Sequence, residues 1–241
     1  MTGPTPRVRK RTDNKSNMWT AAAVTLLLVV LVTGAISIFA SRALNTATTT
    51  TPIEGETSNC PQSSAPPIAV PDGGPTHWEV ITVANGLPIP KNPDYGPHVT
   101  TGVPHCYNSG TAGALFQAAN FATWYLSGAD LLNALDTLAW PDIARQGWED
   151  EILEKCGANL AKCPTEPELP DIVAYAGNQH SATRVDVDLV YDRQPGSGQW
   201  IVLRIPMQWD GQDWRVLMPA AGPLPTNWVT SLDEFTPWRI N

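Results

Sequence analysis

Five side chains in the C-terminal third of the chain have the chemical types that an acid–base site needs. They are Tyr175, His180, Asp186, Asp188 and Tyr191. Asp186 and Asp188 are two residues apart, and on a β-strand this spacing places both carboxylates on one face. Such a pair can act as general acid and base, but the alternate residues of the same stretch are all apolar. We therefore interpret the pair as a solvent-exposed face, with Arg184 as a salt partner.

The two tyrosines are the remaining candidates for a pocket. Tyr191 shares the apolar face of its strand, and a tyrosine in a cavity can donate a proton, as it does in isomerases. A tyrosine in the core with a hydrogen-bonded hydroxyl is a much commoner arrangement. The chain contains no GxSxG, HExxH, P-loop or dinucleotide-binding motif. The sequence therefore predicts no catalytic residue and no cofactor, and disfavours a peptidase or nucleotide-dependent enzyme.

The elements that must position these residues follow from the periodicity of the apolar side chains. Helical spacing indicates three helices, over residues 110–128, 129–140 and 141–156. Alternation indicates four consecutive strands, over residues 171–178, 182–192, 198–210 and 213–219. A further strand is expected over 77–86, and proline-rich 87–109 is expected to be irregular. Helices followed by strands predict an α+β domain, with the helices on the apolar face of an antiparallel sheet of four or more strands.

An uncharged apolar run from Trp19 to Ala40 lies near the start of the chain. As a helix its 22 residues span about 33 Å, enough for a hydrocarbon core of about 30 Å. The preceding segment is basic, which places it in the cytoplasm. The sequence thus predicts a cytoplasmic tail over 1–18, a single transmembrane helix over 19–41 and an extracytoplasmic remainder in the cell membrane.

The charge of the outer part excludes one class of partner. Six of the 15 basic residues lie at or before Arg42, which leaves nine basic against 22 acidic residues beyond it, a net charge of −13. A domain this acidic is not expected to bind nucleic acid. Residues 42–75 are rich in Thr, Pro and Ser, which is typical of a linker, so the folded domain is expected over 76–241.

All four cysteines lie in the outer part: Cys60, Cys106, Cys156 and Cys163. An even number in an oxidising compartment indicates two disulfides. Of the three possible pairings, we favour Cys156–Cys163 with Cys60–Cys106, because the first pair is close in sequence. Seven residues on a helix span about 10.5 Å, too far for a disulfide, so the helix should end at Gly157. A metal site is disfavoured because the chain has no CxxC pair.

Two stretches carry a resemblance to a known group. GVPHCYNSGTAGALFQAANFATWYLSG resembles the opening of a group of uncharacterised actinobacterial membrane-anchored proteins, and WDGQDWRVLMPAAGP resembles their ending. The resemblance covers about residues 100–222 and departs from the group's pattern at Cys106-Tyr107-Asn108. It implies a nuclear-transport-factor-like (SnoaL-like) cone, in which three helices pack on a curved sheet. That fold occurs in TcpC/VirB-type scaffold subunits of conjugation machines and in ketosteroid-isomerase-type enzymes.

Two functions follow as expectations. The first is a non-catalytic scaffold or accessory subunit of a conjugation- or secretion-type assembly, whose partners are other membrane subunits or further copies of itself. Its interface candidates are Trp200, Trp228 and Trp238, since tryptophan is enriched at binding hot spots. Trp200 is expected to be the most exposed because it shares a strand face with Arg204. The alternative is a small-ligand binding protein or isomerase-type enzyme with a pocket at Tyr175 or Tyr191.

Overall fold

The structure is a computed structural model that describes residues 60, 66–71, 74–75, 77–83, 86–157 and 169–239. All of the described residues fall within one compact unit, Ser58–Asn241. The tail expected over 1–18 and the transmembrane helix expected over 19–41 lie outside the described residues. Among the residues that are described, no helix combines the length and apolar character needed to cross a membrane.

Helices and strands are segregated along the chain, as the sequence predicts. The helices are α2 (Thr111–Ser127), α3 (Leu131–Leu138) and α4 (Ile143–Cys156). The strands are β1 (Glu79–Thr82), β2 (Pro88–Lys91), β3 (Asp171–Ser181), β4 (Arg184–Asp192), β5 (Trp200–Trp209), β6 (Trp214–Val216), β7 (Thr226–Val229) and β8 (Thr236–Pro237). Helix α4 ends at Gly157, which has a positive φ of 66° and lies where a close disulfide would require the helix to stop.

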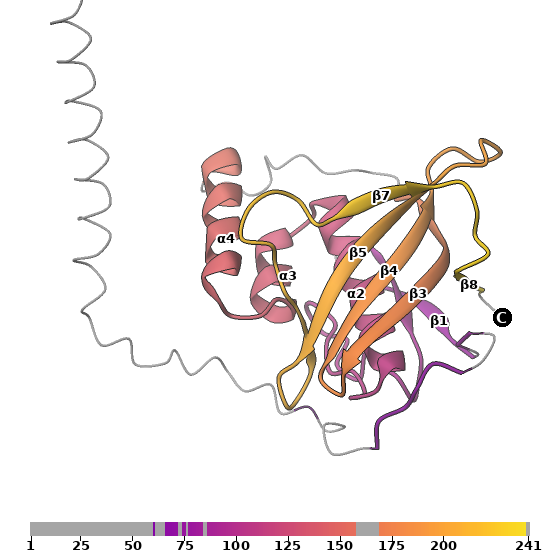
Figure 1. The fold of residues 1–241 in the computed structure, drawn as a ribbon. Coiled ribbons are helices and arrows are strands. Elements are labelled where there is room, and N and C mark those ends of the chain that lie inside the picture. Colours follow the sequence, from indigo (N-terminus) through magenta and orange to yellow (C-terminus); the bar gives the residue numbers. More distant parts are fainter. Residues whose placement is uncertain are drawn as a thin grey trace, which may run out of the picture. The chain divides into compact units, whose positions relative to one another are not determined.

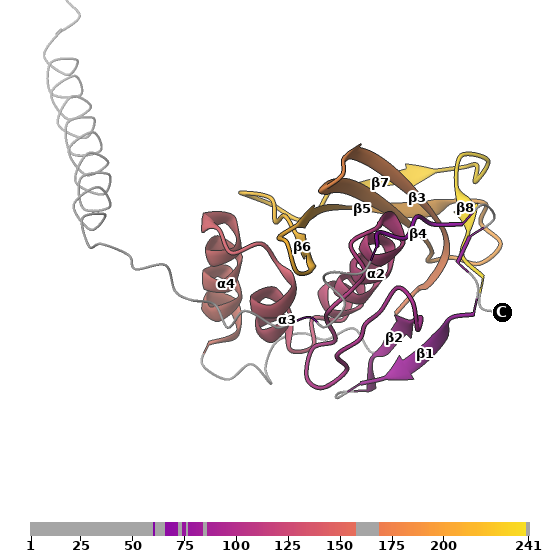
Figure 2. The ribbon, with the colours of Figure 1, turned by 90° about the horizontal axis from the view of Figure 1, so that it is seen from below.

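The three helices pack on one face of an antiparallel six-stranded sheet, so the domain is α+β (Figure 1). The strand order is β6-β5-β4-β3-β8, and β7 pairs with β5 beside β6. Helix α2 lies between this sheet and the small β1–β2 sheet (Figure 2). All of its residues from Ala112 to Trp124 are therefore buried, as a helix that is apolar on all sides requires. The sheet is not curled (Figures 1 and 2).

Strand β5 explains how a proline is accommodated within the sheet. Pro206 lies where β5 changes neighbours. Residues 200–203 pair with β7, and residues 207–209 pair with β6. The carbonyl of Pro206 accepts a hydrogen bond from the Leu217 N–H on that side. The missing N–H of the proline thus falls in the gap between two short neighbouring strands, where no ladder bond is lost.

Three strands were not expected from the sequence. The proline-rich segment after residue 87 contains β2, which pairs with β1 in a two-stranded sheet. Proline is tolerated there because an edge strand needs N–H donors on one side only. The C-terminal segment supplies β7 and β8, which add to opposite sides of the meander. The pairing of this segment enlarges the sheet from the four expected strands to six.

Part of the segment with linker composition belongs to the folded domain. The Asn108 side chain accepts a hydrogen bond from the Ile68 N–H at 2.8 Å and donates one to the Pro66 carbonyl at 3.0 Å. The Ala112 N–H donates to the Ile68 carbonyl at 3.1 Å. These bonds hold residues 66–70 against the start of α2, so the domain extends before residue 76.

Candidate binding groove on the outer face of the sheet

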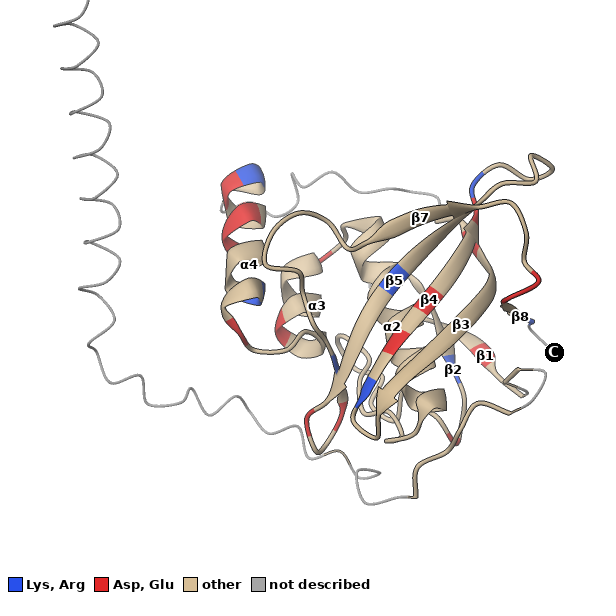
Figure 3. Cartoon of the chain, viewed as in Figure 1, with Lys and Arg blue, Asp and Glu red and all other residues tan. Residues whose placement is uncertain are grey.

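An ion pair marks the sheet face that points away from the helices. Asp188 on β4 and Arg204 on β5 are direct cross-strand partners. The Arg204 guanidinium donates two hydrogen bonds to the Asp188 carboxylate, each of 2.7 Å, and these bonds raise the pKa of Arg204. The charged positions on β4 and β5 lie side by side (Figure 3). The sequence predicts that Asp188 lies on a polar face, but it assigns the salt partner to Arg184 instead of Arg204.

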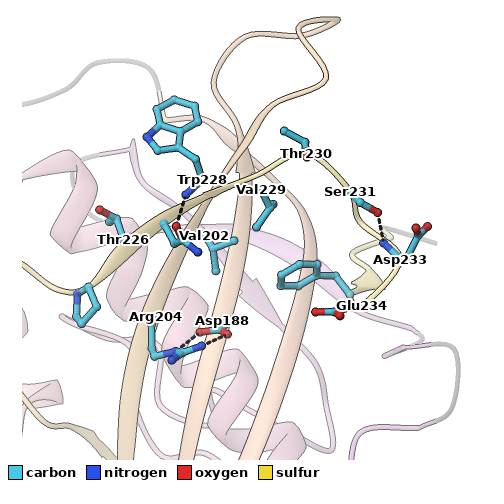
Figure 4. Close-up of a pocket in the computed structure, with 13 residues that line it drawn as sticks. Asp188, Val202, Arg204, Thr226, Trp228, Val229, Thr230, Ser231, Asp233 and Glu234 are labelled. Atoms are coloured by element: carbon cyan, nitrogen blue, oxygen red, sulfur yellow. Dashed lines mark hydrogen bonds and ion pairs between the residues drawn. The ribbon is translucent and has the colours of Figure 1, made fainter.

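A groove of about 710 Å³ opens above this pair. Its floor comes from β4 and β5, and its wall comes from residues 225–235, which cross the end of the sheet (Figure 4). The lining residues combine apolar, hydroxyl, amide and charged side chains. They are Asp188, Val202, Arg204, Pro225, Thr226, Asn227, Trp228, Val229, Thr230, Ser231, Asp233, Glu234 and Phe235.

The wall is held in place by a second, small hydrophobic cluster. Its buried members are Ala174, Val190 and Val202, on the outer face of β3, β4 and β5. Leu232 and Phe235 from the C-terminal segment pack against them, and the backbone of β7 pairs with β5 over Leu203↔Thr226 to Trp200↔Val229. The segment is therefore fixed at both ends, by β7 and by β8.

Two carboxylates of the wall have no cationic partner in the described part of the chain. Asp233 and Glu234 are both exposed, and every ion pair found between described residues involves other carboxylates. Since Asp188 and Arg204 neutralise each other, the charges that line the groove sum to −2. The groove can therefore bind a ligand through electrostatic attraction and through contact with the side chains that line it.

The structure places both predicted pocket tyrosines elsewhere. Tyr175 and Tyr191 are each 4% exposed and belong to the main hydrophobic core between the sheet and the helices. Burial raises the pKa of Tyr175 to about 12 and also raises the pKa of Tyr191. Neither hydroxyl is a ready proton donor or acceptor near neutral pH, and neither residue lines the groove.

The three predicted interface tryptophans have different surroundings. Trp228 on β7 is 61% exposed and lines the groove. Trp200 on β5 is half-buried and packs against the second cluster, close to where β7 pairs with β5. Trp238 is partly buried and packs against the main core, with its ring 5.0 Å from Trp78 and 5.8 Å from Tyr175. The expected order of exposure is therefore wrong for Trp200, which packs against the second cluster and lies opposite Val229 of β7, a strand that the sequence does not predict.

The remaining acid–base candidates belong to two separate groups, one around Asp186 and one around Asp188. His180 Nε2 lies 3.0 Å from an Asp186 carboxylate oxygen, close to the β3–β4 turn. Arg184 Nε lies 3.9 Å from the other oxygen of Asp186, so Arg184 does act as a salt partner within this face. Asp186 and Asp188 share the outer face, as their spacing predicts, but each is bound to its own partner.

Cys60 and Cys106 form a disulfide with a Cα–Cα distance of 5.2 Å. Cys156 is also disulfide-bonded, and its expected partner Cys163 lies outside the described residues. In the described part, Cys60, Cys106 and Asp213 gather as possible metal ligands within 4.8 Å of one another. Both sulfurs are already bonded to each other, so this group offers no free set of ligands.

Asp213 is a buried residue that the sequence reasoning passed over. Its carboxylate accepts hydrogen bonds from the backbone N–H groups of Cys106, Tyr107 and Trp214 at 2.7, 2.9 and 2.9 Å. Burial raises the pKa of Asp213 to about 6, against the opposing effect of these bonds. The sequence does carry one signal for this residue, because Asp213 belongs to the Asp210–Trp214 turn motif. Its role is to join the disulfide-bearing loop to the β5–β6 turn.

Comparisons with known proteins place the chain in a family. No curated protein and no solved structure matches the chain. A family model described as "Domain of unknown function (DUF8175)" matches residues 41–237. This match includes the segment with linker composition, all three helices and all of the sheet strands. The chain therefore belongs to the DUF8175 family.

Proposed function

We propose that this protein is a non-catalytic, membrane-anchored scaffold or accessory subunit whose outer domain makes protein–protein contacts. The observation that carries the proposal is Trp228, a tryptophan 61% exposed beside an open groove. A large aromatic side chain gives much contact area at small entropic cost, and tryptophan is strongly enriched at binding hot spots. The apolar run over 19–40 supports the membrane anchor.

We place this subunit in a conjugation- or secretion-type assembly, with its tail in the cytoplasm and its α+β domain outside the cell membrane. The resemblance of the two sequence stretches supports this assignment. Helices followed by an antiparallel meander also support a relation to the nuclear-transport-factor-like cone, whereas the sheet that is not curled counts against it. Its partners are then other membrane subunits or further copies of this chain.

The alternative, a small-ligand or isomerase-type activity, needs a cavity at Tyr175 or Tyr191. Both side chains are packed in the main core. The groove on the opposite sheet face holds only carboxylates and an arginine as ionisable groups. No observation in the described part of the chain favours this alternative.

Photo-crosslinking in the native membrane tests the proposal. The photoreactive amino acid p-benzoylphenylalanine replaces Trp228 in the full-length protein, and Ile143 in a matched control. Ile143 is an apolar side chain on α4 that is 85% exposed and does not line the groove. We expect a discrete protein adduct from position 228 and none from position 143. Adducts from position 143 alone would place the interface on α4, and the absence of adducts from both positions would refute the assembly role.

A further inference from the structure

The charge of the groove restricts what it can bind. Asp188 and Arg204 are joined by two hydrogen bonds of 2.7 Å, so this pair contributes no net charge. Asp233 and Glu234 stand on the wall above it, both exposed. Figure 4 shows Glu234 and Asp188 bordering the same hollow. A polyanion such as nucleic acid would be repelled by the net negative lining, whereas a cationic group would be attracted.

Apolar and hydrogen-bonding groups accompany the two carboxylates. Val202 and Val229 contribute apolar surface (Figure 4). Thr226, Asn227 and Ser231 contribute hydroxyl and amide groups, which both donate and accept hydrogen bonds. A polypeptide in extended conformation needs this combination, because its backbone carries a donor and an acceptor at nearly every residue. The volume of about 710 Å³ is also far larger than a single metal ion occupies.

We propose that the groove binds an extended polypeptide segment of a partner protein that carries lysine or arginine side chains. This inference rests on the proposed function and names the chemistry of the partner. The aliphatic part of a lysine or arginine lies along apolar surface while its charged end stays in a polar environment. In the groove, that end reaches the carboxylate of Glu234, and Asp233 adds negative charge at the rim. Charge-assisted hydrogen bonds to carboxylates are the stronger kind.

Fluorescence anisotropy with the purified full-length protein tests the occupant. The probe is a fluorescein-labelled decapeptide of alternating lysine and serine, and its comparison peptide has glutamate in place of lysine. We expect the lysine peptide to bind and added salt to weaken the binding. The glutamate peptide should not bind.

A double variant and a matched control locate the site. Asp233→Asn with Glu234→Gln removes both uncompensated carboxylates, and we expect affinity for the lysine peptide to fall about tenfold. Asp150→Asn with Glu154→Gln makes the same change in charge on α4, also at exposed residues outside the groove. This control should leave affinity unchanged.

Three results would overturn the inference. The first is that the lysine peptide does not bind. The second is that both double variants weaken the binding of the lysine peptide equally. The third is that a neutral glucan hexasaccharide binds, and that neither the groove variant nor salt changes its affinity. An adduct from position 228 without binding of the lysine peptide would keep the interface and reject this occupant. Binding of the lysine peptide without an adduct in cells would keep the recognition of cations and reject the assembly role.

Discussion

Replacement of Gly113 by alanine tests how the start of α2 is packed. A Cβ at this position would lie 1.9 Å from the carbonyl oxygen of Asn108. That oxygen accepts a hydrogen bond of 3.0 Å from the buried indole N–H of Trp214, so it cannot move aside freely. Overpacking costs about 1–3 kcal/mol, and an unsatisfied buried N–H costs about 1–3 kcal/mol more. Alanine returns only about 1 kcal/mol of helix propensity, so we expect Gly113→Ala to destabilise the domain by about 3 kcal/mol.

Gly147 is the matched control, because it is also a helical glycine but has no atom within 4 Å of an added Cβ. Gly147→Ala should therefore stabilise the domain by up to about 1 kcal/mol. Urea unfolding of the full-length protein, followed by tryptophan fluorescence, measures both variants. Equal free energies of unfolding for the two variants would refute the close approach between α2 and the loop that carries Asn108.

Three further predictions concern the core and the disulfide. Burial raises the pKa of Asp213 from 3.8 to about 6. The folded state therefore holds this proton more tightly than the unfolded state, so the contribution of Asp213 to stability is complete below pH 3.8 and decreases by roughly 3 kcal/mol as the pH rises from 3.8 through 6. Asp213→Asn should remove this part of the pH dependence, measured as urea midpoints against pH, and an unchanged profile would contradict the assignment. Trp238→Ala should cost about 3 kcal/mol of unfolding free energy, whereas Trp228→Ala should change it by less than about 0.5 kcal/mol; similar losses in the two variants would place Trp238 outside the core. Replacement of Cys60 and Cys106 by alanine opens a loop with a sequence separation of 46 residues. The chain-entropy model therefore predicts that the free energy of unfolding falls by about 4 kcal/mol, measured by thermal or urea unfolding. Wild-type stability in this variant would count against a structural disulfide.

The sequence predicts the helices and central strands well because their signals are local. The alternation of apolar residues in β4 and β5 places Val187 and Leu203 on the helix side of the sheet, and both are buried there. Gly128 ends α2 in the left-handed conformation, where glycine carries no steric cost. Apolar periodicity and such stop signals lie within a few residues of the elements that they define.

The groove could not be predicted because its parts are far apart in the sequence. Its wall is the segment 225–235, whose strand β7 is short and has no clear alternation. This segment becomes a strand only by pairing with β5, which sets Val229 opposite Trp200 and leaves Trp228 exposed. The salt partner of Asp188 also depends on the register of β4 and β5, which sets Arg204 opposite it. Such long-range pairing reflects tertiary context that outweighs local β propensity.

The sequence alone determined the order of the helices and central strands, the acidic character of the chain after Arg42 and the polar face of Asp186 and Asp188. These properties depend on residue type and on spacing along one element. Tertiary structure decided which aromatic side chains are buried, which charges are paired and where the groove lies. Tyr175 and Trp238 meet in the core because β8 pairs with β3, and Asp213 is buried because the loop at Cys106 folds over it. Contacts of this kind form between residues that are distant in sequence, so only the packed chain selects them.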